Sequence, residues 1–164
     1  MRLPTGFRTM MAVLALALAA RAEARCWREQ EASAARLRQM QTMLMVAALR
    51  CRAAGMDIGD EYDGFVRAHR PTLDSANAVL RRHFEGPGAA RSGYDRFATA
   101  LANRYGRDAT TPDDCAGAGM LARDLAGTDR SALSGIAASR VLPPALPDGS
   151  CRAIGEKTQL ASAR

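Results

Sequence analysis

Residues 42–49 read Thr-Met-Leu-Met-Val-Ala-Ala-Leu, a run that is apolar on almost every side of a helix. A helix without a polar face is typical of the centre of a bundle, where other helices cover it. Outward from this run, apolar residues recur at spacings of three and four from Ala34 to Ala54, and Gly55 is a helix stop signal. The pattern predicts a long first helix from Trp27, ended by Gly55.

Four further helical segments are predicted downstream. Asp57 is expected to cap the second helix, whose apolar stripe continues through Pro71 to Phe84 and therefore predicts a kink or a break at the proline. Thr111-Pro112-Asp113-Asp114 is the strongest start signal, because it combines an N-cap residue, a first-turn proline and two acids. The expected ranges are 57–84, 94–105, 111–127 and 131–141.

The composition supports an all-α fold. Aromatic residues make up only 5% of the chain, so the core must be built from Ala, Leu, Met and Val. Small core residues favour closely packed helices, and few β-branched runs point to strands. We therefore predict a small up-down helical bundle of four to five helices with two disulfides and an irregular C-terminal tail.

The N-terminal residues are typical of a secretory signal peptide. Arg2 and Arg8 lead into an apolar run of about eleven residues, which is shorter than the roughly 20 that a membrane-spanning helix needs. Small residues follow at 20–24, so we expect cleavage after Ala24 and a periplasmic or secreted protein with no membrane span after processing. The predicted parts are a signal peptide over 1–24, a helical domain over 25–142 and an extended tail over 143–164.

All four cysteines follow the expected cleavage site, which predicts disulfides in an oxidising compartment. Cys26 and Cys51 lie at opposite ends of one predicted helix, roughly 37 Å apart, and a bridged Cα pair allows only about 7 Å. In an up-down bundle, the end of the first helix lies near the start of the fourth. We therefore predict a Cys51–Cys115 bridge and a second bridge from Cys26 to Cys151, which would tether the tail.

Three residues are candidates for chemistry. His69 lies on the apolar stripe of the second helix, where a hydrogen-bonded core histidine is favoured over a metal ligand or a catalytic base. Met40 and Met43 share a helix face, and paired thioethers can hold Cu(I), although methionine packing explains the same pattern. His83, beside two arginines near a helix end, is expected to be solvated.

Several function classes lack their sequence signals. There is no C-x-x-C, no G-x-S-x-G and no G-x-G-x-x-G motif, so no catalytic set, metal site or cofactor is predicted. The formal net charge is +6, but the arginines are dispersed and Lys157 is the only lysine. A nucleic-acid interface would cluster these charges, so we expect no nucleic-acid partner.

Three segments, Leu37 to Arg52, Tyr94 to Tyr105 and Asp114-Cys115, resemble a group of short exported helical proteins of alphaproteobacteria. Some members of that group carry the label S-adenosyl-L-homocysteine hydrolase. The resemblance implies an exported helical protein and brings no characterised activity. The hydrolase itself is a larger cytosolic enzyme that binds NAD on a Rossmann domain, and this sequence has neither the strands nor the glycine fingerprint of that domain.

The sequence favours a non-enzymatic binding or interaction module. Its partner is expected to be an envelope protein or a small apolar ligand held between helices. Two alternatives remain at this stage. One is a periplasmic hydrolase that uses His69 with a nearby carboxylate, and the other is a Cu(I)-binding protein that uses Met40 and Met43.

Overall fold

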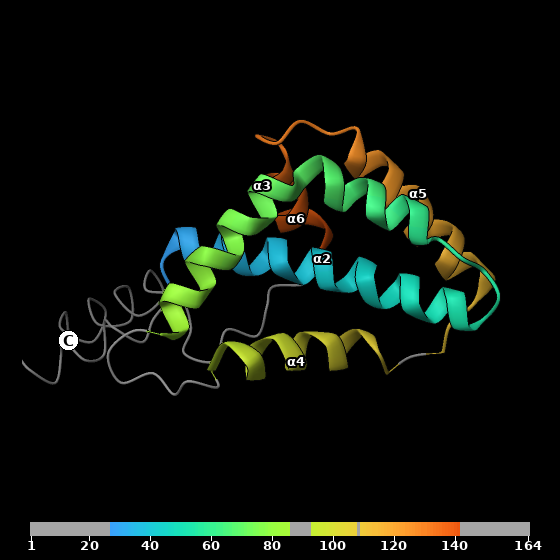
Figure 1. The fold of residues 1–164 in the computed structure, drawn as a ribbon, viewed down its shortest axis with the longest axis horizontal. Helices are drawn as coiled ribbons and strands as arrows, with labels where there is room; N and C mark the ends of the chain where they lie inside the picture. Colours follow the sequence, from blue (N-terminus) through green and yellow to red (C-terminus); the bar gives the residue numbers. More distant parts are fainter. Residues whose placement is uncertain (1–26, 86–92, 108, 142–164) are drawn as a thin grey trace, which may run out of the picture. The chain divides into compact units, whose positions relative to one another are not determined.

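The computed structural model describes residues 27–85, 93–107 and 109–141, and five helices form most of this part of the chain (Figure 1). They are α2 (Glu29–Ala53), α3 (Gly59–Phe84), α4 (Gly93–Tyr105), α5 (Pro112–Ala126) and α6 (Leu133–Arg140). The all-α class is confirmed. The described residues between 30 and 141 belong to one compact unit. The regular up-down order of the helices stays a prediction.

The first predicted helix is α2, and it is buried on nearly every side. Its buried residues are Ala32, Ala34, Ala35, Leu37, Gln39, Met40, Thr42, Leu44, Val46, Ala48 and Cys51. No residue from 31 to 48 is fully exposed, so α2 presents no broad solvent-facing side along most of its length. The helix begins at Glu29, two residues after the expected start at Trp27, which is an ordinary uncertainty for a helix end.

Gly55 ends α2 as predicted. Its φ is +81°, the only positive value among the described residues. The amide of Gly55 donates to the carbonyl of Arg52 at 3.1 Å, and the amide of Met56 donates to the carbonyl of Cys51 at 2.8 Å. These two bonds form a Schellman motif, which needs a left-handed residue at this position and therefore favours glycine.

Two glycine-to-alanine variants should change stability in opposite directions. At Gly55 a Cβ would meet no atom within 4 Å, so only the positive φ opposes alanine, and Gly55→Ala should lower the free energy of unfolding by about 1–2 kcal/mol. At Gly64, inside α3, a Cβ also meets nothing within 4 Å. Gly64→Ala should raise the free energy of unfolding by about 0.5–1 kcal/mol, because alanine is the better helix former. Urea unfolding of both variants checks this, and a shift of the same sign in both would contradict it.

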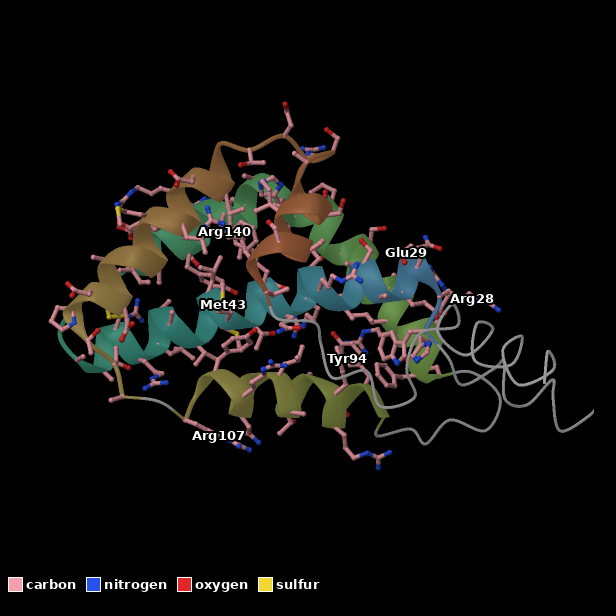
Figure 2. The ribbon with its side chains drawn as sticks, turned by 180° about the vertical axis from the view of Figure 1, so that it is seen from behind. Arg28, Glu29, Met43, Tyr94, Arg107 and Arg140 are labelled. Carbon is pink, nitrogen blue, oxygen red and sulfur yellow. A yellow bond between two sulfur atoms is a disulfide. The ribbon has the colours of Figure 1, made fainter. Side chains whose placement is uncertain are left out.

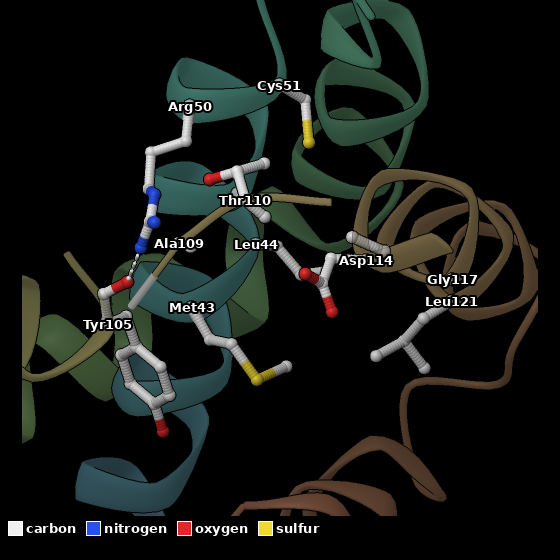
Figure 3. A pocket seen from close by; sticks show the side chains of 12 residues that line it. Met43, Leu44, Arg50, Cys51, Tyr105, Ala109, Thr110, Asp114, Gly117 and Leu121 are labelled. Carbon is white, nitrogen blue, oxygen red and sulfur yellow. Dashed lines mark hydrogen bonds between the residues drawn. The ribbon is translucent and has the colours of Figure 1, made fainter. Parts of the chain in front are cut away.

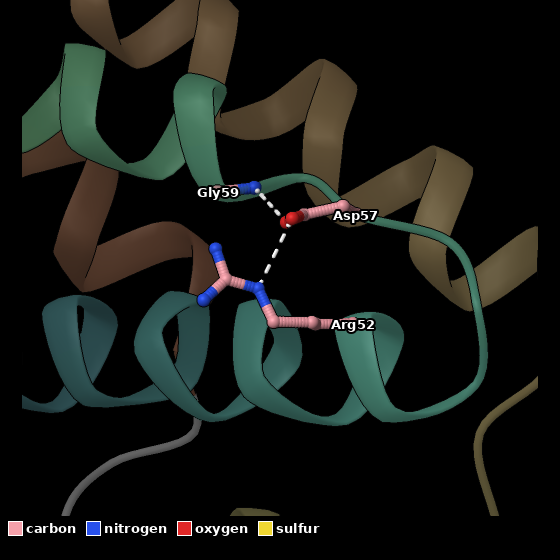
Figure 4. Close-up of polar contacts among 3 residues, drawn as sticks. All are labelled: Arg52, Asp57 and Gly59. Carbon is pink, nitrogen blue, oxygen red and sulfur yellow. Dashed lines mark hydrogen bonds and ion pairs between the residues drawn. The ribbon is translucent and has the colours of Figure 1, made fainter.

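The second predicted helix is α3, which begins one residue later than Asp57 as its N-cap would require. Its N-cap is Ile58, without a side-chain cap, so the expectation of Asp57 as the N-cap was wrong by one position. The carboxylate of Asp57 still serves the helix start, because its Oδ1 accepts the amide of Gly59 at 2.8 Å (Figure 4). Its Oδ2 accepts Nε of Arg52 at 3.0 Å. The hydrogen bond from the Gly59 amide makes the largest contribution to lowering the pKa of Asp57, and the hydrogen bond from Arg52 makes the next largest.

Pro71 does not break α3, which is one continuous helix from Gly59 to Phe84 and bends along its course (Figure 1). A proline has no N–H, so the helix loses one backbone hydrogen bond there. Pro71 is exposed, and the residues that α3 buries on either side of it keep the helix together: Phe65, His69, Leu73, Ala76, Val79 and Leu80. Of the two expected outcomes, a bend in one helix is the one observed.

Tyr94 contributes to the contact between α3 and α4 and lies between helices (Figure 2), beside a contact between the rings of Phe84 and Phe97. Its hydroxyl donates to Oδ1 of Asn77 at 3.0 Å. The guanidinium of Arg81 lies 4.7 Å from the centre of its ring, within the range of a cation–π contact. Tyr94 therefore helps to pack α4 against α3 through both its ring and its hydroxyl.

The start of α5 is as predicted. The hydroxyl of Thr111 accepts the amide of Asp114, and the carboxylate of Asp114 accepts the amide of Thr111, with Pro112 in the first turn. This reciprocal pair is a capping box, which satisfies donors that a helix start otherwise leaves open. The helix ends at Ala126, directly before the expected stop at Gly127.

The predicted Cys51–Cys115 disulfide is present, with a Cα–Cα distance of 5.7 Å. One bridge is therefore described where two were expected. The second, from Cys26 to Cys151, lies outside the described residues, as do the expected signal peptide and C-terminal tail. Within residues 27–85, 93–107 and 109–141, no helix is both long enough and apolar enough to cross a membrane.

Candidate functional site

A groove with a volume of about 360 Å³ lies between α2, α5 and the connection from α4 to α5 (Figure 3). Met43, Leu44 and Ala47 line it from α2, and Ala118 and Leu121 line it from α5. These side chains are apolar, so the floor of the groove offers a ligand van der Waals contact and release from water. Ligand pockets in proteins typically have volumes of about 300–1,000 Å³ and mostly apolar linings, so this groove lies at the lower end of that range.

Short side chains keep the groove open. Ala47 on α2 and Gly117 and Ala118 on α5 do not fill the space where the two helices face each other. The disulfide between Cys51 and Cys115 joins these helices next to the groove, and Cys51 itself contributes to the lining. A covalent link at one end and small residues beyond it therefore set the spacing between α2 and α5.

The wall from α4 ends at Tyr105, which α2 holds at two points. Nε2 of Gln39 donates to the Tyr105 hydroxyl at 2.6 Å, and Nη1 of Arg50 donates to the Tyr105 carbonyl at 2.8 Å. A basic side chain on a C-terminal carbonyl also complements the helix dipole. The end of α4 is thus held to α2 beside the groove.

The rim carries two opposite charges, Arg50 from α2 and Asp114 from α5. Oδ2 of Asp114 accepts the Thr111 hydroxyl at 2.7 Å and the Thr111 amide at 3.0 Å. These bonds lower the pKa of the Asp114 carboxyl, and the charge of Arg50 lowers it further. Asp114 is therefore a carboxylate at neutral pH, and the groove presents one cation and one anion above an apolar floor.

His69 lies in the core and is not part of the groove lining. Its side chain is 1% exposed, and its Nε2 donates to the carbonyl of Leu125 at 2.7 Å. The centre of its ring lies 5.6 Å from that of Phe65, and its Nδ1 has no hydrogen-bond partner among the described residues. Because the Leu125 carbonyl can only accept, the proton must be on Nε2. This is the hydrogen-bonded core histidine that the sequence favoured.

The two candidate methionines have different surroundings. Met40 is fully buried in the core, whereas Met43 is half-buried and lines the groove. Met43 therefore belongs to the candidate site through its apolar contact surface. In the part of the chain that the structure describes, no group of three or more His, Cys, Asp or Glu side chains is placed to hold a metal ion.

His83 was expected to be solvated, and that expectation was wrong. Its side chain is 11% exposed, and its Nδ1 lies 3.3 Å from Oε2 of Glu31. Its ring meets the ring of Phe84 edge-on at 5.1 Å. The continuous α3 carries His83 back to the first turns of α2, a contact between distant residues that no local sequence pattern shows.

Sequence reasoning missed the groove and its two rim charges. The sequence pattern identified Asp114 only as an acidic residue at a helix start, and it gave no role to Arg50. A usable signal was nevertheless present, because Arg50 and Asp114 each directly precede a cysteine of the predicted Cys51–Cys115 bridge. Comparisons of the chain with protein-family models, curated proteins and solved structures found no match.

Proposed function

We propose that this protein is an exported, non-enzymatic binding module that holds a small, largely apolar ligand in the groove between α2 and α5. The observation that carries this proposal is the groove itself, about 360 Å³ in volume, with an apolar floor and two charged groups at its rim. A mostly apolar lining with a few polar groups is how proteins bind small molecules with both affinity and orientation.

Export to the periplasm, or secretion, is the cellular part of this proposal. It rests on the signal-peptide pattern of residues 1–24 and on the disulfide between Cys51 and Cys115, which is compatible with an oxidising compartment. We further propose that the helices form an up-down bundle and that a Cys26–Cys151 bridge tethers the tail. An envelope protein remains the alternative partner.

The two other functional hypotheses have less support. A hydrolase that uses His69 needs its ring to reach both a substrate and a carboxylate, but the side chain is 1% exposed, its Nε2 is bonded to the Leu125 carbonyl, and no described carboxylate pairs with the ring. A Cu(I) site that uses Met40 and Met43 needs both sulfur atoms to reach one ion, but Met40 is fully buried. Neither hypothesis has an observation that favours it over binding.

A fluorescence titration with N-phenyl-1-naphthylamine, an uncharged apolar fluorophore, tests the proposed site. The variant Ala47→Leu should weaken its binding by roughly tenfold or more, because the added isobutyl group occupies the groove. The matched control is Ala53→Leu, which makes the same change on the exposed last residue of α2. This control should bind the fluorophore as the unmodified protein does.

Circular dichroism and the mass of the non-reduced protein establish that each variant is folded and disulfide-bonded. Two results would overturn the proposal. One is the absence of fluorophore binding to the unmodified protein, and the other is equal affinity in Ala47→Leu and Ala53→Leu. Binding that only Ala47→Leu weakens would support it.

A further inference from the structure

Two groups of opposite charge line the groove, Arg50 on α2 and Asp114 on α5. Figure 3 shows Arg50 on α2, with its guanidinium directed at the Tyr105 carbonyl, and Asp114 on α5. The charge of Arg50 contributes to the lowered pKa of Asp114, so the two groups interact through space. No ion pair joins these two described side chains. A ligand that carries both charges could therefore place one charge against each side chain, and both contacts would be electrostatically favourable.

Each charged group is engaged on one side and open on the other. Both hydrogen bonds to the Asp114 carboxylate end on Oδ2, and no described residue bonds Oδ1. Arg50 uses Nη1 for the Tyr105 carbonyl, and no described residue bonds its Nε or Nη2. A guanidinium has five N–H donors and a carboxylate has several lone pairs, so both groups keep capacity for a ligand.

We propose that the groove selects a small zwitterion with an aliphatic body, of the kind an apolar amino acid presents, with its ammonium on Asp114 and its carboxylate on Arg50. This inference rests on the proposed function and names its ligand class. The aliphatic part would lie on Met43, Leu44 and Leu121, where burial of apolar surface stabilises the complex.

The arrangement disfavours ligands with a single charge. A simple anion would be attracted by Arg50 but repelled by Asp114. A simple cation would be attracted by Asp114 but repelled by Arg50. An uncharged ligand would make no charge–charge interaction with Arg50 or Asp114, and both side chains would stay hydrated. A ligand that carries both charges gains two charge-assisted hydrogen bonds, which are stronger than neutral ones.

Calorimetric titration with four related compounds separates these cases. Leucine carries both charges, N-acetyl-leucine only the negative one, leucinamide only the positive one, and N-acetyl-leucinamide neither. At slightly acidic pH, where the amines are protonated, leucine should bind roughly tenfold or more tighter than each of the other three. This comparison uses the unmodified protein and needs no variant.

Two variants then assign the charges. Asp114→Asn should weaken the binding of leucine and leucinamide by roughly tenfold and leave N-acetyl-leucine no weaker. Arg50→Gln, which keeps a donor for the Tyr105 carbonyl, should weaken leucine and N-acetyl-leucine and leave leucinamide no weaker. The controls are Asp113→Asn and Arg52→Gln, exposed neighbours that do not line the groove, and both should bind leucine normally.

The outcomes distinguish this inference from the proposed function. If N-acetyl-leucinamide binds as tightly as leucine, or if the fluorophore binds and leucine does not, zwitterion selection is wrong while the groove remains a binding site. If neither the fluorophore nor any of the four compounds binds, both proposals are overturned. Tighter binding of leucine that responds to both variants would support the inference.

Discussion

Replacing Cys51 and Cys115 together by alanine should lower the free energy of unfolding by about 4 kcal/mol. The bridge joins residues 64 positions apart, so it removes many conformations from the unfolded chain, and the chain-entropy relation for a loop of this length gives that magnitude. Both cysteines are almost fully buried, so the variant also loses packing between α2 and α5. Urea unfolding followed by circular dichroism measures the change.

The same double variant should bind the apolar fluorophore more weakly, because the disulfide helps set the distance between the walls of the groove. Double replacement avoids the free thiol that a single replacement would leave. A loss of less than about 1 kcal/mol, the centre of the range for ordinary point mutations, would contradict the role assigned to this bridge.

Phe65→Ala should lower the free energy of unfolding by about 3–5 kcal/mol. Phe65 is completely buried on α3, and its ring packs beside that of His69. Truncation removes its contacts and leaves a cavity that the surrounding helices fill only in part. Thermal and urea unfolding both measure this loss.

The matched comparison is Val66→Ala, which truncates the next residue, a half-buried one, on the same helix. Its effect should be smaller, about 1 kcal/mol or less. Equal losses in the two variants would show that the side of α3 that carries Phe65 is not the one that holds the core together.

The helices could be predicted from the sequence because their signals are local. The apolar run in α2, the glycine at position 55 and the Thr111 capping box each depend on neighbours within one or two helical turns. The Cys51–Cys115 bridge needed one further step, the order in which helices cross the fold. Helix length excludes only Cys26 as the partner of Cys51, so the choice of Cys115 rested on the expected up-down order, which stays a prediction although the bridge itself is present.

Other features depend on contacts that no local pattern contains. Whether Pro71 breaks or bends α3 depends on what the helix buries on both sides of the proline. The pairing of His83 with Glu31 follows only from the unbroken helix. The groove arises where small residues of α2 and α5 face each other beside the end of α4, so it belongs to the packing rather than to one segment.

The central claim is that the groove between α2 and α5 is the binding site. A map of amide chemical shifts in isotope-labelled protein, titrated with N-phenyl-1-naphthylamine, tests it most directly. We expect the largest shifts in residues 43–51 of α2, in 105–110 and in 114–121, with little change in α6. Shifts centred on α6 or on the side of α3 away from α5, or no shifts at concentrations where the fluorophore stays soluble, would contradict the account.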